Sequence, residues 1–289
     1  MVYKAVLWMS VALASFCLMA VAAKELSNEV DTFQVLFFRS FIGLIVITSI
    51  LLASRNASLF TTQRIKLHGM RNSVHFLGQM AWFIGIGLLP LAEVFALEFT
   101  VPLWTALIAA LFLKERLTVK KLLSIAFGFA GVLVIVQPGM KAIDAASLIV
   151  LASAIGYAIA HTCTKSLSST EHPLTILFYM SLIQLPIGFA LAMLNWKTPE
   201  GIQWFWLATV ALTSLTAHFS IAKAMQNAEA TVVVTMDFLR LPLIAVVGVL
   251  FYAEPFEVAL LAGAALMLFG NLINVASPKG RTSRVAEKQ

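Results

Sequence analysis

Residues 37–44 read FFRSFIGL, and residues 178–185, 141 positions further along the chain, read FYMSLIQL. Both stretches begin with two aromatic residues, and a serine (Ser40 or Ser181), an isoleucine and a leucine then occupy the same places. At the same offset, residues 24–27 (KELS) fall on residues 165–168 (KSLS). Two matches at one spacing predict that the chain contains two related halves.

Further matches occur in the same order along both halves. The pairs are Ala92-Glu93 with Ala228-Glu229, Pro102 with Pro242, Glu115 with Glu254, and Gly131 with Gly270. Their offsets vary between 136 and 141, which indicates short insertions between the halves. We therefore predict one repeat at residues 1–139, a second at residues 140–276, and a basic tail at residues 277–289.

The composition is that of a membrane protein. Hydrophobic residues make up 60% of the chain and charged residues 12%, and the mean hydropathy is +0.91. Soluble domains are about 45–50% apolar and about 25% charged. These values exclude a soluble enzyme, a disulfide scaffold and a disordered chain. Helices are the expected elements, because backbone groups in hydrocarbon have no water to bind.

Ten apolar segments are separated by charged or turn-forming residues, and each is long enough to cross a bilayer. The segments are residues 5–23, 33–54, 69–89, 92–113, 120–137, 146–166, 173–194, 203–222, 230–251 and 256–276. Five spans per half is an odd number, so the second half must enter the membrane from the opposite side. The predicted fold class is an all-α membrane protein with ten transmembrane helices in two inverted five-helix repeats, a plan that recurs in secondary transporters.

The distribution of basic residues predicts the orientation. With a cytoplasmic N-terminus, fifteen lysines and arginines fall on the inner side, and only Lys24, Lys141 and Lys197 fall outside. Cytoplasmic loops carry the excess of lysine and arginine in membrane proteins. Both termini are therefore expected in the cytoplasm.

Ionisable side chains within the spans are costly, about 2.5–3.5 kcal/mol each near the bilayer centre, and so indicate function. Those in this chain are Arg39, His75, Glu98, His161, His218, Asp237 and Arg240. The topology places Glu98 in the outer third of its span and Asp237 in the inner third of the equivalent span. We expect the two acids to serve gating or coupling, with Arg39 and Arg240 as counter-charges. The structural alternative is simple pairing, of Glu98 with Arg39 and of Asp237 with Arg240.

Two spans carry a polar face. Arg71, His75, Gln79 and Trp82 share one side of the third span, and Ser153, Tyr157, His161 and Thr164 share one side of the sixth. Such faces look into a cavity or a helix interface. The residues expected to contact a solute are Gln79, Trp82, Trp104, Tyr157, His161 and His218. The alternative is hydrogen bonding between helices, worth about 0.6 kcal/mol per bond.

Other features narrow the chemistry. Pro102 and Pro242 should kink or open the fourth and ninth spans. The sequence contains no P-loop, HExxH or GxSxG pattern, so ATP-driven pumping and familiar hydrolase chemistry have no support. Cys17 and Cys163 lie in apolar runs, and the basic residues are scattered. No cofactor, metal site or nucleic-acid partner is therefore predicted.

The chain resembles the drug/metabolite transporter superfamily, and within it the EamA-type transporters. The resemblance rests on residues 89–93 (LPLAE), Pro102, residues 114–117 (KERL), Gly128, Gly131 and residues 138–139 (PG), with Pro242, Glu254 and Gly270 as echoes in the second half. It implies a bacterial inner-membrane carrier with a central cavity lined by helices one, three, four, six, eight and nine, which would add Ser15 to the residues above. Members move amino acids, riboflavin, S-adenosylmethionine, nucleobases or drugs.

The expected function is a secondary transporter that moves a small organic metabolite by alternating access: an amino acid, a vitamin such as riboflavin, or a nucleobase-like solute. Its partners would be the solute, membrane lipid and, as a candidate coupling ion, the proton, in a monomer or a homodimer. Two alternatives stay open. One is a membrane-embedded enzyme that uses His161, His218 and Asp237, and the other is a channel or structural subunit.

Overall fold

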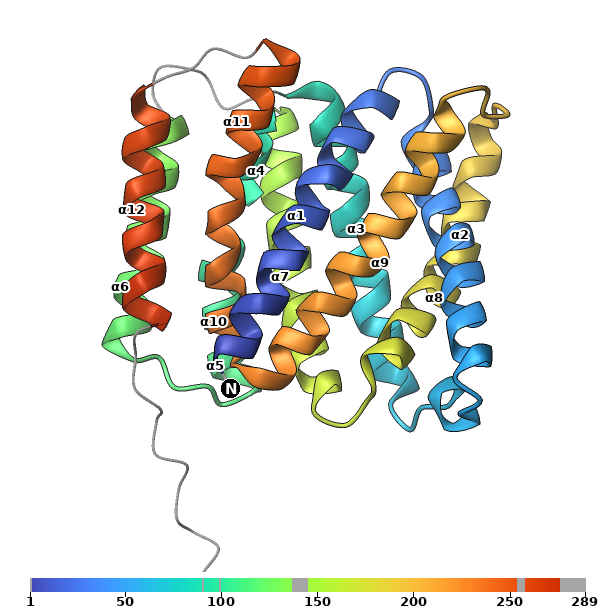
Figure 1. The fold of residues 1–289 in the computed structure, drawn as a ribbon, viewed down its shortest axis with the longest axis horizontal. Helices are drawn as coiled ribbons and strands as arrows, with labels where there is room; N and C mark the ends of the chain where they lie inside the picture. Colours follow the sequence, from blue (N-terminus) through green and yellow to red (C-terminus); the bar gives the residue numbers. More distant parts are fainter. Residues whose placement is uncertain (1, 90, 99, 137–144, 254–257, 276–289) are drawn as a thin grey trace, which may run out of the picture.

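The computed structural model describes residues 2–89, 91–98, 100–136, 145–253 and 258–275. The predicted boundary between the halves at 139/140 and the basic tail at residues 277–289 lie outside these ranges, as does Glu254. Within the described ranges every regular element is a helix and there is no strand (Figure 1).

The helices coincide with all ten predicted segments, and their bounds differ from the predicted ones by five residues at most, at the end of α9. The α-helices are α1 (Val2–Leu26), α2 (Thr32–Ala53), α3 (Ile65–Leu88), α4 (Leu91–Glu98), α5 (Val101–Phe112), α6 (Val119–Val136), α7 (Ala145–Ser168), α8 (Pro173–Ala192), α9 (Gln203–Asn227), α10 (Ala230–Met236), α11 (Arg240–Tyr252) and α12 (Val258–Val275). The 3₁₀ helices are η1 (Ala57–Phe60), η2 (Met193–Asn195) and η3 (Asp237–Leu239).

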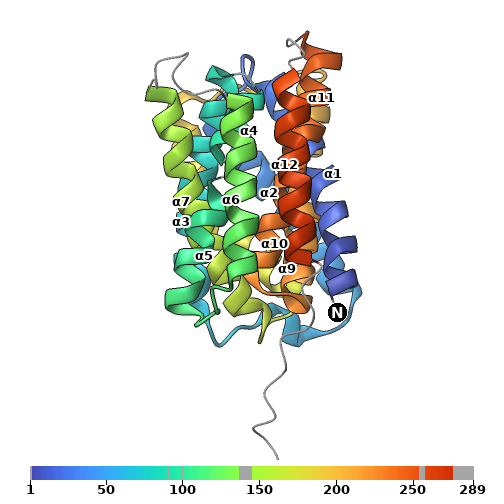
Figure 2. The same ribbon diagram turned by 90° about the vertical axis from the view of Figure 1, so that its left-hand side faces the viewer.

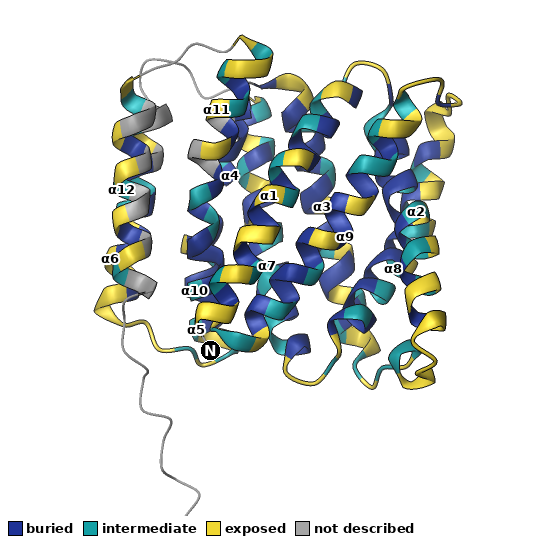
Figure 3. Ribbon diagram, viewed as in Figure 1, coloured by how far each residue is buried: buried dark blue, intermediate teal, exposed yellow. Residues whose placement is uncertain are grey.

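Several helices are long and apolar enough to cross a membrane. Among the described residues, five meet this condition: Tyr3–Leu26, Thr32–Ala53, Ala145–Ser168, Pro173–Asn195 and Gln203–Asn227. Their outward faces carry exposed apolar side chains, and the buried residues gather where the helices face each other (Figure 3). An apolar outer surface of this extent is typical of a protein surrounded by lipid.

Two of the predicted spans are broken near their middle. The segment at residues 92–113 consists of α4 and α5, and the segment at residues 230–251 consists of α10, η3 and α11. Pro102 is the second residue of α5, and Pro242 is the third residue of α11. Proline lacks the N–H that would continue the preceding helix, and its ring excludes the carbonyl four residues earlier. The prediction that these prolines open the two spans is confirmed.

The helices pack in pairs that join the two halves of the chain. In Figure 1, α6 and α12 lie side by side at the left edge and α2 and α8 at the right edge, with α1, α3, α7 and α9 between them. Viewed from the left, α6 and α12 form the front of the bundle (Figure 2). The central pairs are α1 with α9 and α3 with α7, and the half-length helices pack as α4 with α11 and α5 with α10.

Glycines allow α3 and α7 to approach closely. A Cβ on Gly78 would lie 3.3 Å from the Ser153 carbonyl oxygen, and a Cβ on Gly156 would lie 3.3 Å from the Val74 carbonyl oxygen. Small residues at a crossing let two helix backbones meet in a bilayer. The crossing brings together the two faces that the sequence marks as polar.

One lysine in each half caps the end of another helix. Lys24 at the end of α1 donates from Nζ to the carbonyl oxygens of Ile86 (3.0 Å) and Leu89 (3.3 Å). Lys165 near the end of α7 does the same to the carbonyl oxygens of Met225 (2.6 Å) and Ala228 (2.7 Å). Carbonyls at a helix C-terminus have no partner within the helix, and a cation there is favourable.

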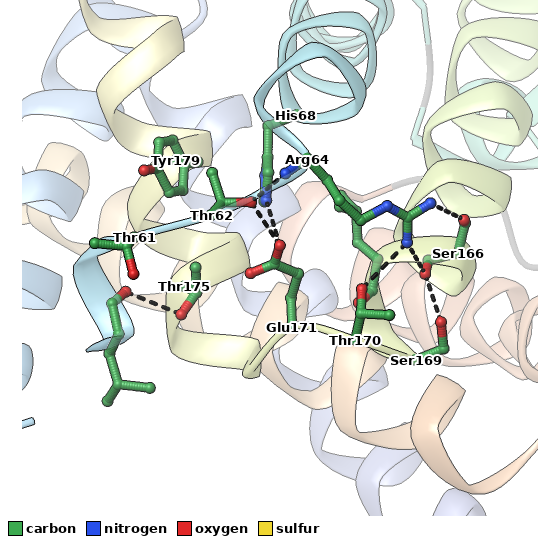
Figure 4. Close-up of polar contacts among 12 residues, drawn as sticks. Thr61, Thr62, Arg64, His68, Ser166, Ser169, Thr170, Glu171, Thr175 and Tyr179 are labelled. Atoms are coloured by element: carbon green, nitrogen blue, oxygen red, sulfur yellow. Dashed lines mark hydrogen bonds and ion pairs between the residues drawn. The ribbon is translucent and has the colours of Figure 1, made fainter. Parts of the chain in front are cut away.

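Polar contacts tie the start of α3 to the turn between α7 and α8 (Figure 4). Arg64 donates to the carbonyl oxygen and Oγ of Ser166, both at 2.7 Å, and to Thr170 Oγ1 at 3.2 Å. Thr62 Oγ1 donates to Glu171 Oε1 at 2.5 Å. These bonds connect the two halves at the end of the molecule where the α1 N-terminus lies (Figure 1).

We expect Arg64→Ala to destabilise the purified protein by about 1–2 kcal/mol, because it removes three hydrogen bonds from a charged donor. Lys66→Ala is the matched control, since Lys66 is an exposed basic residue in the first turn of α3, two positions after Arg64. Thermal unfolding in detergent should show a lower Tm for Arg64→Ala only. Equal Tm values for the two variants would contradict this role.

Candidate functional site

A small cavity lies in the middle of the bundle and is lined from α1, α3, α4, α7, α9, η3 and α11. Its lining residues are Phe16, Met19, His75, Gln79, Trp82, Phe83, Glu98, Tyr157, His161, His218, Asp237 and Arg240. The structure thus brings eight of the ten residues predicted for contact or coupling to one place. The charged members come from the two broken spans.

Arg240 joins the two acids at the cavity. Its Nη2 atom donates to Glu98 Oε1 at 2.7 Å and to Asp237 Oδ2 at 2.6 Å. Trp82 Nε1 donates to the second oxygen of Glu98, also at 2.7 Å. Glu98, Arg240 and Trp82 are each at most 6% exposed. This cluster therefore carries two negative charges and one positive charge inside the bundle.

Aromatic rings enclose the guanidinium group. The Arg240 Cζ atom lies 4.6 Å from the centre of the Phe16 ring and 4.9 Å from that of Phe95. Cations over aromatic faces gain up to about 2 kcal/mol when desolvated. The Trp82 ring meets that of Phe95 edge-on, with 5.9 Å between centroids. Aromatic residues of α1, α3 and α4 thus hold the side chain of Arg240, the first residue of α11, in place.

The breaks in the two spans explain why these charges meet. Glu98 is the last residue of α4, Asp237 is the first of η3, and Arg240 is the first of α11. Each acid lies about eight residues, or about 12 Å, from the end at which its span begins. Both acids therefore lie at the break of their own span, where Arg240 reaches both of them.

The predicted pairing of Glu98 with Arg39 is wrong. Glu98 binds Arg240 instead, while the predicted pairing of Asp237 with Arg240 is confirmed. The two acids share one guanidinium group, because Arg240 Nη2 donates to both.

Arg39 lies behind the cavity rather than in it. It is 3% exposed, donates to Ser214 Oγ at 2.5 Å, and donates from Nη2 to Gln184 Oε1. Gln184 Nε2 is in turn 3.0 Å from His75 Nδ1, and His75 lines the cavity. Arg39 is therefore connected to the cavity by hydrogen bonds through Gln184, which lies against the His75 ring.

The remaining differences concern side chains with weak sequence signals. Trp104 does not line the cavity and packs instead against Val101, Ala154 and Ala158. Ser15, which the family resemblance suggested, is also absent from the lining, whereas its neighbour Phe16 is present. Phe16, Met19 and Phe83 lie in uniformly apolar runs that give no sign of a cavity. His75 was identifiable, because it lies on the polar face of the third span.

The histidines and Tyr157 form the other wall. His75 and His218 meet edge-on with 4.7 Å between ring centroids, and His75 and Tyr157 are 5.7 Å apart. Among the described residues, no group of three or more His, Cys, Asp or Glu side chains could hold a metal ion. Aromatic rings, imidazoles and a charged cluster in one cavity can bind an organic solute that is partly planar and partly polar.

The cavity has a volume of about 30 Å³, enough for about two water molecules. Sites for drug-sized ligands are usually about 300–1,000 Å³. A larger hollow of about 500 Å³ lies at the end of the bundle, lined by the loop residues Glu29, Lys197 and Glu200 and by Gln34 in the first turn of α2. There Gln34 already donates to the Lys197 carbonyl oxygen at 2.7 Å. The central cavity, where the predicted residues gather, is the candidate site.

An all-helical bundle with long apolar helices, two broken spans and a polar central cavity is the architecture of membrane transporters. The chain belongs to the EamA-like transporter family, whose model matches residues 3–137 and again residues 145–276. The expected membership of the drug/metabolite transporter superfamily is confirmed, and the family is one of transporters rather than enzymes.

Relatives of known name are bacterial transporters of small molecules. The chain is 25% identical over 282 residues to an S-adenosylmethionine uptake transporter of Rickettsia felis, which covers 98% of this chain and 96% of that protein. It is 30% identical over 259 residues to a riboflavin transporter of Brucella anthropi, and the alignment covers 87% of this chain and 90% of that protein. A pseudopaline exporter of Pseudomonas aeruginosa is 25% identical over 268 residues, covering 92% and 94%.

A solved crystal structure shares the fold. It superposes with a TM-score of 0.76 at 18% sequence identity and covers 94% of this chain and 96% of its own. At that identity the likeness establishes the fold alone.

We expect Arg240→Met to destabilise the protein by about 3–5 kcal/mol, because two buried acids lose their counter-charge. Adding Glu98→Gln to Arg240→Met should restore part of this loss, since it removes one of the uncompensated charges. Thermal unfolding of the single and double variants measures the coupling. Arg116→Met, at an exposed arginine, is the control. Strictly additive effects would show that Glu98 and Arg240 do not interact.

Proposed function

We propose that the protein is a secondary transporter that carries a small organic metabolite across the bacterial inner membrane by alternating access, without ATP. The observation that carries the proposal is the junction of the two broken spans. Each half contributes one such span, and their breaks meet at the central cavity through Glu98, Asp237 and Arg240.

The helix pairing supports two inverted repeats. Replacing each helix by its counterpart in the other half (α1 by α7, α2 by α8, α3 by α9, α4 by α10, α5 by α11, α6 by α12) turns each main pair either into itself or into another observed pair. For example, α1 with α9 becomes α7 with α3, and α4 with α11 becomes α10 with α5. The lysine caps of α3 and α9 are related in the same way. With ten crossings, such a repeat can rock between two equivalent states.

The closed cavity fits one step of this cycle. A metabolite needs far more space than the cavity offers, so solute entry requires helices to separate on one side. Trp82 and Phe83 follow Gln79 along α3 toward the end at which α4 begins, and they line the cavity together with the Glu98–Arg240 pair. We propose that this group forms the gate on that side.

The roles of individual residues follow from their positions. Gln79, Trp82, Tyr157, His161 and His218 would contact the solute. Glu98, Asp237 and Arg240 would gate the cavity or couple solute movement to protons. The solutes of the named relatives, S-adenosylmethionine and riboflavin, both carry a planar ring system, which suits the aromatic lining. Trp104 and Arg39 are not proposed to touch the solute.

The proposed setting is a multi-pass protein of the inner membrane with both termini in the cytoplasm. Membrane lipid would cover the exposed apolar faces, and the protein would act as a monomer or a homodimer. The basic residues favour this orientation, because fifteen of them fall on the cytoplasmic side.

Proteoliposome counterflow tests the transport cycle. Purified protein preloaded with an unlabelled metabolite should accumulate the labelled form with saturable kinetics. Glu98→Gln and Asp237→Asn should lower the rate at least tenfold, because each removes a charge from the central cluster. Glu200→Gln, at an exposed acid far from the cavity, should leave the rate unchanged.

Chemical conversion of the solute would instead support the membrane-embedded enzyme, and conductance without saturation would support the channel. If both acid substitutions leave transport and its pH dependence intact, the proposed role of the acids is wrong, even though the carrier stands.

Cysteine labelling tests the orientation. In a variant without Cys17 and Cys163, Thr198→Cys should react with a membrane-impermeant maleimide in intact cells, whereas Asn56→Cys should react only after permeabilisation. Thr198 lies between α8 and α9, and Asn56 lies between α2 and α3, at opposite ends of the bundle. The reverse pattern of labelling would place the termini outside.

A further inference from the structure

The two acids of the central cluster differ in how many of their carboxylate oxygens accept a hydrogen bond. Both oxygens of Glu98 accept a hydrogen bond, one from Trp82 and one from Arg240. Asp237 accepts from Arg240 at Oδ2, but its buried Oδ1 accepts none. A buried carboxylate oxygen without a donor costs about 1–3 kcal/mol or more. Asp237 Oδ1 is therefore a buried acceptor without a donor, on a residue that lines the candidate site.

A second open acceptor belongs to the same cavity. The side-chain oxygen of Gln79 is buried and has no hydrogen-bond partner, and Gln79 is 3% exposed. Gln79 and Asp237 both line the cavity, from α3 and from the break between α10 and α11. Two acceptors without donors call for a ligand that donates hydrogen bonds.

The charge of the lining residues also bears on which ligand the cavity could bind. With neutral histidines, the lining holds two carboxylates and one guanidinium group, a net charge of −1. Two other buried cations, Arg39 and Arg71, do not line the cavity and donate to neutral hydroxyl and amide groups behind it. Within the lining itself one carboxylate charge is left uncompensated, and a positively charged ligand group beside Asp237 would neutralise it.

The walls suit such a group as well. Phe16, Trp82 and Tyr157 present aromatic rings to the cavity, and aromatic faces attract cations within about 6 Å of the ring centre. The cavity volume of about 30 Å³ matches a group of one or two heavy atoms. The closed form therefore has room for the head of a solute, such as an ammonium group.

We propose that the cavity contains a subsite for the N–H-bearing cationic group of the solute, with Asp237 Oδ1 as the charged acceptor and Gln79 Oε1 as the neutral acceptor. The inference rests on the proposed function and names its substrate class: organic cations that carry an amino or ammonium group beside an apolar or planar part. In this arrangement Glu98 holds Arg240 and Trp82 in place, and Asp237 binds the solute.

Three probes that share a 2-phenylethyl part but differ in the head group separate charge from hydrogen bonding. The probes are 2-phenylethylammonium, its N-trimethyl derivative, which keeps the charge but has no N–H, and 2-phenylethanol, which is neutral. Binding to the purified full-length protein is measured as the rise in Tm over a concentration series. We expect the ammonium to bind at least tenfold more tightly than the alcohol and at least threefold more tightly than the trimethyl derivative.

Variants assign the two preferences to residues. Asp237→Asn should remove the preference for the ammonium over the alcohol, and Gln79→Met should reduce its preference over the trimethyl derivative. Glu200→Gln makes the same change in net charge as Asp237→Asn at an exposed site and should leave both preferences intact. The order of affinity of the three probes is measured first on the wild-type protein, so the proposal can be tested even if Asp237→Asn does not fold.

The proposal is overturned if the alcohol binds as tightly as the ammonium, if no probe raises the Tm, or if folded Asp237→Asn keeps the wild-type ranking. Saturable counterflow of a neutral metabolite alongside any of these results would leave the transport function standing and reject only the cationic subsite. Absence of counterflow for every metabolite, with the ranking intact, would reject transport and keep the subsite.

Discussion

The contact between Glu98 and Arg240 is the interaction on which the arrangement of the central helices depends. Glu98 ends α4 and Arg240 begins α11, so each charge lies at the end of a helix where its own helix dipole disfavours it. The 2.7 Å bond between them compensates both unfavourable positions at once. It also joins the two halves of the chain at the centre of the bundle, where isolated charges are most costly.

The broken spans give this ion pair its place. In a continuous helix at residues 92–113, Glu98 would lie in the interior of the helix, where every backbone group is hydrogen-bonded within the helix. The break before Pro102 makes Glu98 a terminal residue, and the break before Pro242 does the same for Asp237 and Arg240. The two breaks meet at one cavity, which Glu98, Asp237 and Arg240 line together.

The sequence was sufficient to predict the helices, both breaks and most of the cavity, for identifiable physical reasons. Membrane-spanning helices are recognisable in a sequence as long hydrophobic segments. The prolines indicate where two of these helices break, and the polar face containing His75 and Gln79 indicates which side of α3 lines the cavity. The partner of Glu98 was not predictable, because the choice between Arg39 and Arg240 depends on how α2 and α11 pack rather than on depth. Phe16 and Met19 were not predictable either, since every face of α1 is apolar. Trp104 looked similar to Trp82 in sequence, but its side of α5 faces Ala154 and Ala158 on α7.

The central claim is that the Glu98–Arg240 pair holds the bundle closed on the side where α4 begins. Its most direct test is the distance between spin labels at Leu88→Cys on α3 and Leu250→Cys on α11, two exposed positions near that end, measured in liposomes by pulsed electron spin resonance. We expect one narrow distance distribution in the otherwise unchanged protein and an added, longer population once Glu98→Gln is introduced. Identical narrow distributions with and without Glu98→Gln would contradict the claim.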